Sequence, residues 1–373
     1  MWTLARKILL YDRVKFLVAA AGVSVSVFLV LVQIGLYLGF MQNASNIIDN
    51  SRADLWVASA GTENFDVAAP MDERTFYRVA ETPGVARAER MVLAFGQFKM
   101  PSGGAQGVEV VGLERHARLF WPWNVVEGDA RAVGEVDGIV VDRSEFSKLQ
   151  MSAIGDRREI TGMRSRIVAL TQGIRSFTTS PYIFTNIQTA RAYTRLTPDQ
   201  ITYVLVSAAP GVSIATLRDR LNRIPYVSAY DTRDFSARAR AYWSERTGVG
   251  VGFFMTAMMG VIVGLVVVGQ ILYNGTLEHI REYGTMKAMG AENGAIVRVI
   301  LYQALISAAL GLILGGGMAV LARSGLRAAN LSVLLTPGLL AVTAVLTAVM
   351  CSLASLLSIV KVLRLDPASV FKG

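Results

Sequence analysis

Four long stretches without a charged residue constrain the fold of this chain more than any other feature. No Asp, Glu, Lys or Arg occurs in residues 16–48, 247–277, 299–322 or 328–360. Each stretch exceeds the roughly 20 apolar residues that a helix needs to cross a bilayer. The sequence therefore predicts four transmembrane helices, over residues 16–41, 247–273, 299–322 and 332–360. The first is too long for the apolar core of a signal peptide, about 7–15 residues, so we expect it to be retained.

The distribution of charge supports this assignment. The 373 residues are 53% hydrophobic and 17% charged, with a net charge of +9 and a pI of about 9.8. Residues 40–247 contain 25 Lys and Arg against 23 Asp and Glu, whereas the rest contains 12 against 5. The excess positive charge thus lies beside the predicted spans, where Lys and Arg favour the cytoplasmic side. A basic pI of this origin predicts contact with membrane lipid and none with nucleic acid.

The basic residues at the two ends of the chain predict its orientation. Residues 1–15 include four Lys and Arg and one Asp, and residues 361–373 include three Lys and Arg. Both ends are therefore expected in the cytoplasm, as four spans require. Residues 42–246 then form a large domain outside the cytoplasm, and residues 323–331 form a short outer loop. Residues 274–298 form a cytoplasmic loop. Apolar residues at helical spacing predict an amphipathic helix over residues 1–15.

The large outer segment reads as an α+β domain. Alternating or apolar β-branched runs predict strands at residues 54–58, 107–111, 138–141 and 201–206, and helices are predicted at 72–82 and 213–224. Both helices end at a proline, at Pro83 and Pro225, before an extended run. A charged run without Gly or Pro predicts a helix over residues 231–246, which we expect to continue directly into the second span.

Groups that could perform catalysis are scarce. The GxxxxGK[ST] phosphate-binding loop and the GxSxG motif are missing, and the two histidines, His116 and His279, are expected on opposite sides of the membrane. We therefore predict no catalytic residue, no metal site and no cofactor bound by this chain. The predicted spans contain no ionisable residue at depth, which argues against an ion-coupled carrier.

Small residues four apart favour close packing of the spans. They occur as three pairs, Gly35 with Gly39, Gly260 with Gly264, and Gly311 with Gly315.

The cytoplasmic loop holds the most informative segment, Leu277–Ala291. Leu277, Ile280 and Tyr283 or Gly284 share one helical face, whereas Glu278, Arg281 and Glu282 point elsewhere. Gly290 is placed to end this helix in a left-handed conformation. A solvated loop helix without a partner would account for the spacing equally well.

This segment resembles the coupling helix of the MacB/FtsX/LolC superfamily of ABC transporter permeases, because it ends in Lys-Ala-Met-Gly-Ala and lies before the last two spans. The ending Leu365-Asp366-Pro367-Ala368-Ser369-Val370 resembles the tail of that family. The first hundred residues are most similar to the DevC branch, through Gln33-Ile34-Gly35-Leu36, Ala53-Asp54-Leu55-Trp56-Val57, Gly96-Gln97-Phe98-Lys99 and Val110-Val111-Gly112-Leu113. The resemblance implies the MacB/FtsX-like (type VII ABC) permease fold, four membrane helices with a large α+β extracytoplasmic domain.

The resemblance also implies function and partners. It predicts a homodimeric inner-membrane permease of an ATP-driven exporter for a lipid-like or other amphipathic substrate, with two copies of a separate ATPase that bind ATP and Mg²⁺. DevC-like permeases further pair with a periplasmic adaptor (membrane fusion) protein and an outer-membrane channel. The residues expected to contact the ATPase are Glu278, Arg281, Glu282, Tyr283, Gly284, Met286, Lys287, Met289 and Gly290.

Two alternatives remain open. One is a lipoprotein-releasing permease, and the other is an FtsX-like protein that signals across the membrane or regulates a partner without transport.

Overall fold

The computed structural model describes residues 13–178, 180–328 and 331–364. Most of the predicted N-terminal amphipathic helix, and the tail motif after Arg364, lie outside the described residues. The chain divides into two compact units. We call residues 40–248 the sheet domain, and residues 1–39 together with 249–373 the helical domain.

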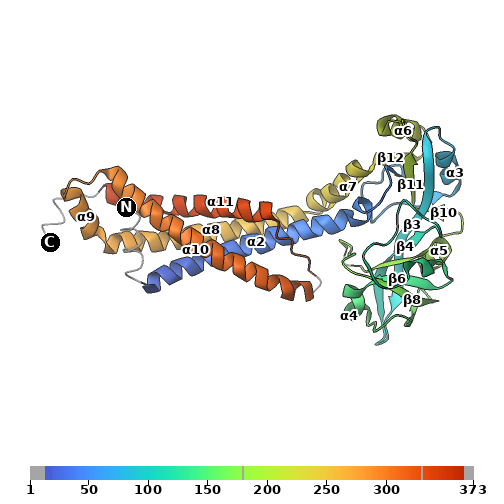
Figure 1. The fold of residues 1–373 in the computed structure, drawn as a ribbon, viewed down its shortest axis with the longest axis horizontal. Helices are drawn as coiled ribbons and strands as arrows, with labels where there is room; N and C mark the ends of the chain where they lie inside the picture. The colour runs from blue at the N-terminus through green and yellow to red at the C-terminus, as the bar shows by residue number, and fades with distance from the viewer. Residues whose placement is uncertain (1–12, 179, 329–330, 365–373) are drawn as a thin grey trace. The chain divides into compact units, whose positions relative to one another are not determined.

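The helical domain is built from long apolar helices (Figure 1). Its elements are α2 (Arg13–Asp49, which continues into the sheet domain), α8 (Val249–Glu278), α9 (Ile280–Ala288), α10 (Asn293–Ala328), α11 (Pro337–Ala354) and α12 (Leu356–Leu363). In the described part of the chain, four helices are long and apolar enough to cross a membrane: Phe16–Asp49, Val249–Glu278, Asn293–Leu326 and Pro337–Leu363. The prediction of four membrane-spanning helices is confirmed.

Two of the predicted small-residue pairs lie where other helices approach α2. A Cβ atom added at Gly260 would come 3.2 Å from Leu29 Cβ, and one added at Gly264 would overlap Ser26. Ser26 Oγ also donates a hydrogen bond of 2.7 Å to the carbonyl oxygen of Gly260. Glycine at these positions lets the backbones of α8 and α2 come close.

The pair on α10 also faces α2. An added Cβ at Gly311 would overlap Val23, and one at Gly315 would come 2.5 Å from Ser24 O. The third pair, Gly35 and Gly39 of α2, lies against residues 332–335, which precede α11.

The sheet domain is organised around one large mixed sheet with the strand order β12-β1-β11-β3-β4-β9-β6-β8-β5, while β7 pairs with β3 and β8. The pairs β4·β9 and β6·β8 are parallel, and the other pairs are antiparallel. The strands are β1 (Leu55–Ser59), β3 (Val85–Lys99), β4 (Ala105–Leu113), β5 (Val125–Gly128), β6 (Gly138–Asp142), β7 (Arg157–Ile160), β8 (Met163–Thr171), β9 (Tyr182–Asn186), β11 (Tyr203–Ala208) and β12 (Val227–Asp231), with β2 (Met71–Asp72) and β10 (Gln200–Ile201) forming a separate pair.

Short helices cover the sheet. They are α3 (Arg74–Ala80), η1 (Ala130–Gly134), η2 (Arg143–Glu145), α4 (Phe146–Leu149), α5 (Ile187–Thr194), α6 (Ile214–Leu221) and α7 (Thr232–Ala241). α3 and α6 place Val79, Leu217 and Leu221 in one apolar cluster with β1 and β11. Three of the four predicted strands and both predicted helices are present, whereas the predicted strand 201–206 is divided into β10 and β11, which belong to different sheets. The α+β assignment is confirmed.

The segment before the second span differs from the prediction. We expected one helix over residues 231–246 that continues directly into the span. Instead, α7 is followed by a turn of π-helix, η3 (Tyr242–Arg246), and Gly248 has φ +73° before α8 begins at Val249. A left-handed backbone cannot continue a right-handed helix, so the prediction of an unbroken link is wrong.

Candidate functional site

The predicted coupling segment forms a separate short helix, α9, between α8 and α10. At its C-terminus, the Ala291 N–H donates to Met286 O over 2.9 Å and the Gly290 N–H donates to Lys287 O over 3.0 Å. Gly290 has φ +89°. These two hydrogen bonds and the left-handed glycine constitute a Schellman motif, which fixes the end of α9 where the sequence predicts it.

One face of α9 is anchored to the helical domain. Tyr283 is 1% exposed and packs in an apolar cluster with Ile296 and Val299 of α10 and with Val362 of α12. Lys287 Nζ donates to the carbonyl oxygens of Val362, over 3.0 Å, and Leu363, over 2.9 Å. A cation at these carbonyls compensates the negative end of the α12 dipole. These contacts join α9 to both α10 and α12.

The opposite face of α9 is exposed. Among the residues predicted to contact the ATPase, Glu278, Arg281, Glu282, Met289 and Gly290 are exposed, Met286 and Lys287 are half-buried, and Tyr283 and Gly284 are buried. Met289 is 77% exposed, and Glu282 Oε2 lies 2.8 Å from His279 Nδ1. The structure thus separates the nine residues into a charged outer face and an inner face that holds α9 in place.

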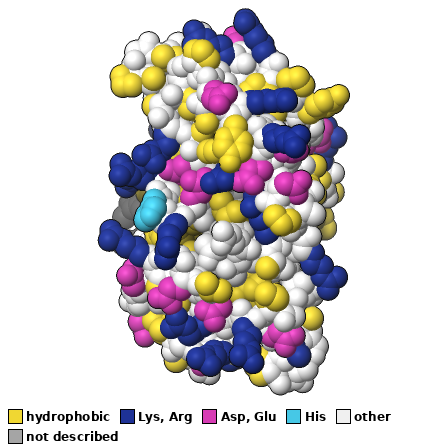
Figure 2. Space-filling view, turned by 90° about the vertical axis from the view of Figure 1, so that its right-hand side faces the viewer, with side chains coloured by type: hydrophobic (Ala, Val, Ile, Leu, Met, Phe, Trp, Pro, Cys, Tyr) yellow, Lys and Arg dark blue, Asp and Glu magenta, His cyan; other side chains and the backbone are white. Residues whose placement is uncertain are grey.

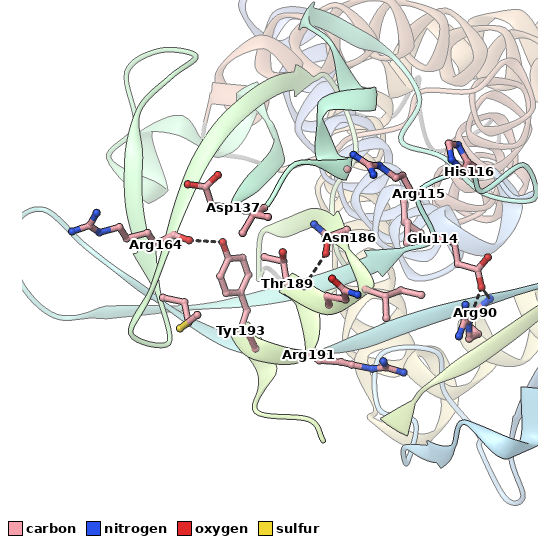
Figure 3. Close-up of a pocket in the computed structure, with 17 residues that line it drawn as sticks. Arg90, Glu114, Arg115, His116, Asp137, Arg164, Asn186, Thr189, Arg191 and Tyr193 are labelled. Atoms are coloured by element: carbon pink, nitrogen blue, oxygen red, sulfur yellow. Dashed lines mark hydrogen bonds and ion pairs between the residues drawn. The ribbon is translucent and has the colours of Figure 1, made fainter. Parts of the chain in front are cut away.

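A second site lies in the sheet domain, where side chains of β3, β4, β8, β9 and α5 line a cleft of about 610 Å³ (Figure 3). Arg90 and Arg191 line one wall and share the carboxylate of Glu73, and Arg90 Nε also pairs with Glu114 Oε1 over 2.7 Å. Arg115, His116 and Arg164 also line the cleft and are exposed. The sequence did not indicate this cleft, because its lining comes from separate segments between Arg90 and Tyr193.

Two buried carboxyl groups form a third feature that sequence reasoning missed. Glu109 of β4 is fully buried, and its Oε1 accepts hydrogen bonds from the hydroxyls of Ser176, over 2.8 Å, and Thr178. Its Oε2 has no hydrogen-bond partner among the described residues. The only signal in the sequence is an acid inside the apolar run Val108–Val111, since such runs form strands that are buried on both faces.

Asp66 lies close to Glu109 and is also buried. Trp243 Nε1 of η3 donates to Asp66 Oδ2 over 3.0 Å, and the Tyr182 hydroxyl donates to Asp66 Oδ1 over 3.4 Å. Burial raises the pKa of Asp66 to about 6. Burial, together with repulsion from Asp66, raises the pKa of Glu109 to about 8. The pair therefore holds at least one proton at neutral pH, because two ionised carboxylates cannot share a dry site without a cation.

Two family models together match nearly the whole chain. The model of the MacB-like periplasmic core domain matches residues 16–224, more than half of the chain, and the model of the FtsX-like permease C-terminal domain matches residues 253–367. This chain belongs to the MacB/FtsX family of ABC transporter permeases. The permease thus has the type VII ABC permease fold, as predicted.

Proteins that are similar to this permease over nearly its whole length are also ABC transporter permeases. The uncharacterized ABC transporter permease Rv2563 of Mycobacterium tuberculosis is 25% identical over 347 residues, 92% of this chain and 91% of the relative. A second uncharacterized ABC transporter permease of that species, Rv0072, is 23% identical over 344 residues, again 92% and 91%.

Two solved structures resemble about half of this permease. The periplasmic region of MacB from Actinobacillus actinomycetemcomitans has a TM-score of 0.36 at 8% identity and covers 50% of this chain and 92% of its own. The extracellular domain of the noncanonic ABC-type transporter YknZ from Gram-positive bacteria has a TM-score of 0.35 at 9% identity, with 48% and 99% covered.

Membership of this family fixes the general role of the permease. Its four apolar helices and its family indicate an inner-membrane protein, and an ABC transporter permease implies an ATPase partner. Its family also indicates a subunit that is not itself catalytic.

Proposed function

We propose that this permease receives the energy of ATP hydrolysis from a separate cytoplasmic ATPase through α9. The division of α9 into two faces carries the proposal. Its outer face presents Arg281, Glu282 and Met289 to solvent, whereas its inner face is fixed by Tyr283 and Lys287 to α10 and α12. A helix that only connected two spans would need neither the exposed Met289 nor the anchoring contacts.

In the proposed mechanism, two ATPase subunits bind ATP and Mg²⁺ and close on each other, and their closure displaces α9 in each copy of a permease homodimer. Because α9 is anchored to α10 and α12, the displacement passes into the spans. Because the helix is broken at Gly248, α8 is poorly suited to transmit this displacement to the sheet domain. α2 is the better route, since this helix is continuous from Arg13 to Asp49 and residues 40–49 belong to the sheet domain.

The cargo that we propose is lipid-like or otherwise amphipathic and is handled outside the cytoplasm, with both termini in the cytoplasm and the sheet domain in the periplasm. The apolar spans support this proposal, because the charge-free stretches offer no ionisable group for a polar substrate to bind on a path through the membrane. We further propose that the permease acts in a tripartite system of the DevC type, with a periplasmic adaptor protein and an outer-membrane channel.

The test is association with the ATPase. The tagged full chain is purified from membranes of its own host, and ATP hydrolysis by the co-purified material is measured per permease. We expect Glu282→Lys to abolish this activity, because it reverses a charge on the exposed face of α9. Gly290→Pro should also abolish it, since proline cannot adopt φ +89° and removes the N–H that bonds to Lys287 O.

The matched control is Glu81→Lys, which reverses an exposed charge at the end of α3 in the sheet domain. It should leave the co-purified ATP hydrolysis unchanged. If Glu282→Lys retains as much ATPase activity as Glu81→Lys at equal permease levels, α9 is not the coupling element.

A further inference from the structure

The cleft in the sheet domain has the size and construction of a small-molecule site. Its volume of about 610 Å³ falls within the roughly 300–1,000 Å³ typical of ligand pockets. The lining combines charged, polar and apolar side chains from five separate elements (Figure 3). Several elements converge on the cleft, so the fold itself holds its walls in place.

The arginines on its inner wall are already neutralised. Arg90 pairs with both Glu73 and Glu114, and its guanidinium also lies 4.8 Å from the centre of the Phe76 ring. Arg191 lies 3.2 Å from Glu73 Oε2 and donates through Nε to Gln200 O over 2.8 Å. Two arginines and two glutamates balance in charge. This group therefore stiffens the wall and leaves little charge to attract a ligand.

The remaining charge in the cleft is positive. Arg115 and Arg164 are exposed, and within the described ranges no acidic side chain forms an ion pair with either of them. His116 adjoins Arg115, and Asp137 is the one other acidic residue of the lining besides Glu114. Figure 3 shows the Arg115 side chain directed toward the side of the cleft where Asn186 and Asp137 lie. The space-filling view shows a histidine among Lys and Arg side chains on the visible face (Figure 2).

Apolar side chains flank the same opening. Val136 is 87% exposed and Met163 is 49% exposed, although both are large hydrophobic residues. Both line the cleft together with Leu113, Ile187 and Ala192. Leaving apolar surface in water forgoes about 25 cal/mol for each Å² that a ligand could cover. A ligand with a hydrocarbon part would cover this surface, whereas a simple inorganic anion would not.

We propose that this cleft binds an amphipathic anion, with a carboxylate or phosphate head at Arg115 and a hydrocarbon part over Met163 and Val136. The proposal rests on the proposed function, in that it places amphipathic cargo, or a lipid that regulates its handling, in the sheet domain. The head at Arg115 requires the positive charge of the guanidinium, and the polar side chains of Asn186 and Thr189 border the same space.

Protection of a single cysteine tests the site. Met163→Cys places an exposed thiol at the edge of the cleft, and the native Cys351 is buried. The full-length variant in nanodiscs, without ATP, is labelled by a membrane-impermeant maleimide. The additions are octyl phosphate or octyl glucoside, each below its critical micelle concentration, or inorganic phosphate at the same concentration as octyl phosphate. We expect octyl phosphate to slow labelling, and the other two to have no effect.

The head contact is tested in the same background. Arg115→Gln should raise the octyl phosphate concentration needed for half protection about tenfold, the effect of losing one charged hydrogen bond. Arg131→Gln, which removes an exposed charge of η1 outside the lining, should leave it unchanged. A thiol at Ser102, in the exposed β3–β4 turn, reports non-specific effects of the additive on labelling.

The proposal is overturned if octyl phosphate protects both thiols equally, or if Arg115→Gln and Arg131→Gln behave alike. Equal protection by inorganic phosphate would overturn the hydrocarbon subsite. These outcomes are separable from failure of the proposed function, because labelling needs no ATPase. Glu282→Lys should therefore keep full protection at Met163→Cys.

Discussion

Glu109 should make the stability of the sheet domain depend on pH, and Glu109→Gln should remove most of that dependence. The carboxyl group is fully buried with one unpartnered oxygen among the described residues, and repulsion from Asp66 adds to the effect of burial in raising its pKa. Glutamine has nearly the same shape and can accept the same hydrogen bonds from Ser176 and Thr178, but it cannot ionise. The substitution therefore isolates the titration of Glu109 from its packing.

The direction and size of this pH dependence follow from the difference between the pKa of Glu109 in the folded and unfolded states. The pKa of Glu109 rises from an ordinary 4.5 to about 8 in the folded protein, so between these values the folded state binds more protons than the unfolded state. The contribution of Glu109 to stability is thus most favourable below pH 4.5 and becomes less favourable as pH rises toward 8. At pH 7 the solution is about 2.5 pH units above the pKa of Glu109 in the unfolded chain. At 1.36 kcal/mol per unit, binding a proton to Glu109 on folding therefore costs about 3 kcal/mol of stability.

Thermal unfolding of the full chain in nanodiscs, followed by tryptophan fluorescence from pH 5 to 8, measures this effect. For a domain of this size each kcal/mol shifts Tm by about 2–4 °C. The Tm difference between Glu109→Gln and the native protein should therefore change by roughly 6–12 °C across the range, in favour of the variant at high pH. Glu159→Gln, at an exposed carboxylate paired with Lys99, is the matched control. If native protein and Glu109→Gln show the same pH slope, Glu109 does not hold the proton and the reasoning fails.

Two further predictions concern packing and orientation. Gly315→Ala should destabilise the helical domain by about 1–3 kcal/mol, because its Cβ would meet the Ser24 backbone oxygen at 2.5 Å; Gly316→Ala, with no heavy atom within 4 Å, should be neutral or stabilising in the same thermal melts. A thiol introduced at Ser102 should react with an impermeant maleimide in intact spheroplasts and one at Thr285 should not, and the reverse pattern would contradict the proposed orientation.

The membrane helices were predictable because the property that defines them is local. A stretch without charge that is long enough to cross a bilayer can form little else, so composition alone located four helices. Strands β1 and β4 were predictable for a similar reason, since runs such as Leu55–Val57 fit a buried pleated surface. The sheet order was not predictable. β1 lies between β11 and β12, about 150 residues later in the chain, and nothing in its own five residues specifies these neighbours.

In α9, too, the sequence predicted the features that depend on neighbouring residues, and it did not predict the contacts with distant segments. Gly290 was recognisable, because only glycine readily ends a helix at positive φ, and the requirement lies within one turn. Lys287 was expected to face the ATPase, whereas the structure engages it with α12, 75 residues away. The burial of Glu109 likewise depends on Ser176 and Asp66, which come from distant segments.

The positions of the small residues give a physical reason for α2 to carry the proposed motion. Gly260 and Gly264 of α8, and Gly311 and Gly315 of α10, all lie against α2, so α2 has almost no space in which to yield when α8 or α10 moves. Close-packed interiors transmit a displacement and do not absorb it. Gly248, in contrast, has a left-handed backbone conformation that breaks the helix between η3 and α8, so the two do not move as one rigid helix. In the proposed mechanism, α2 therefore transmits the displacement of α9 to the sheet domain. A larger side chain at Gly315 should then weaken the coupling of ATP hydrolysis to export as well as the stability of the helical domain.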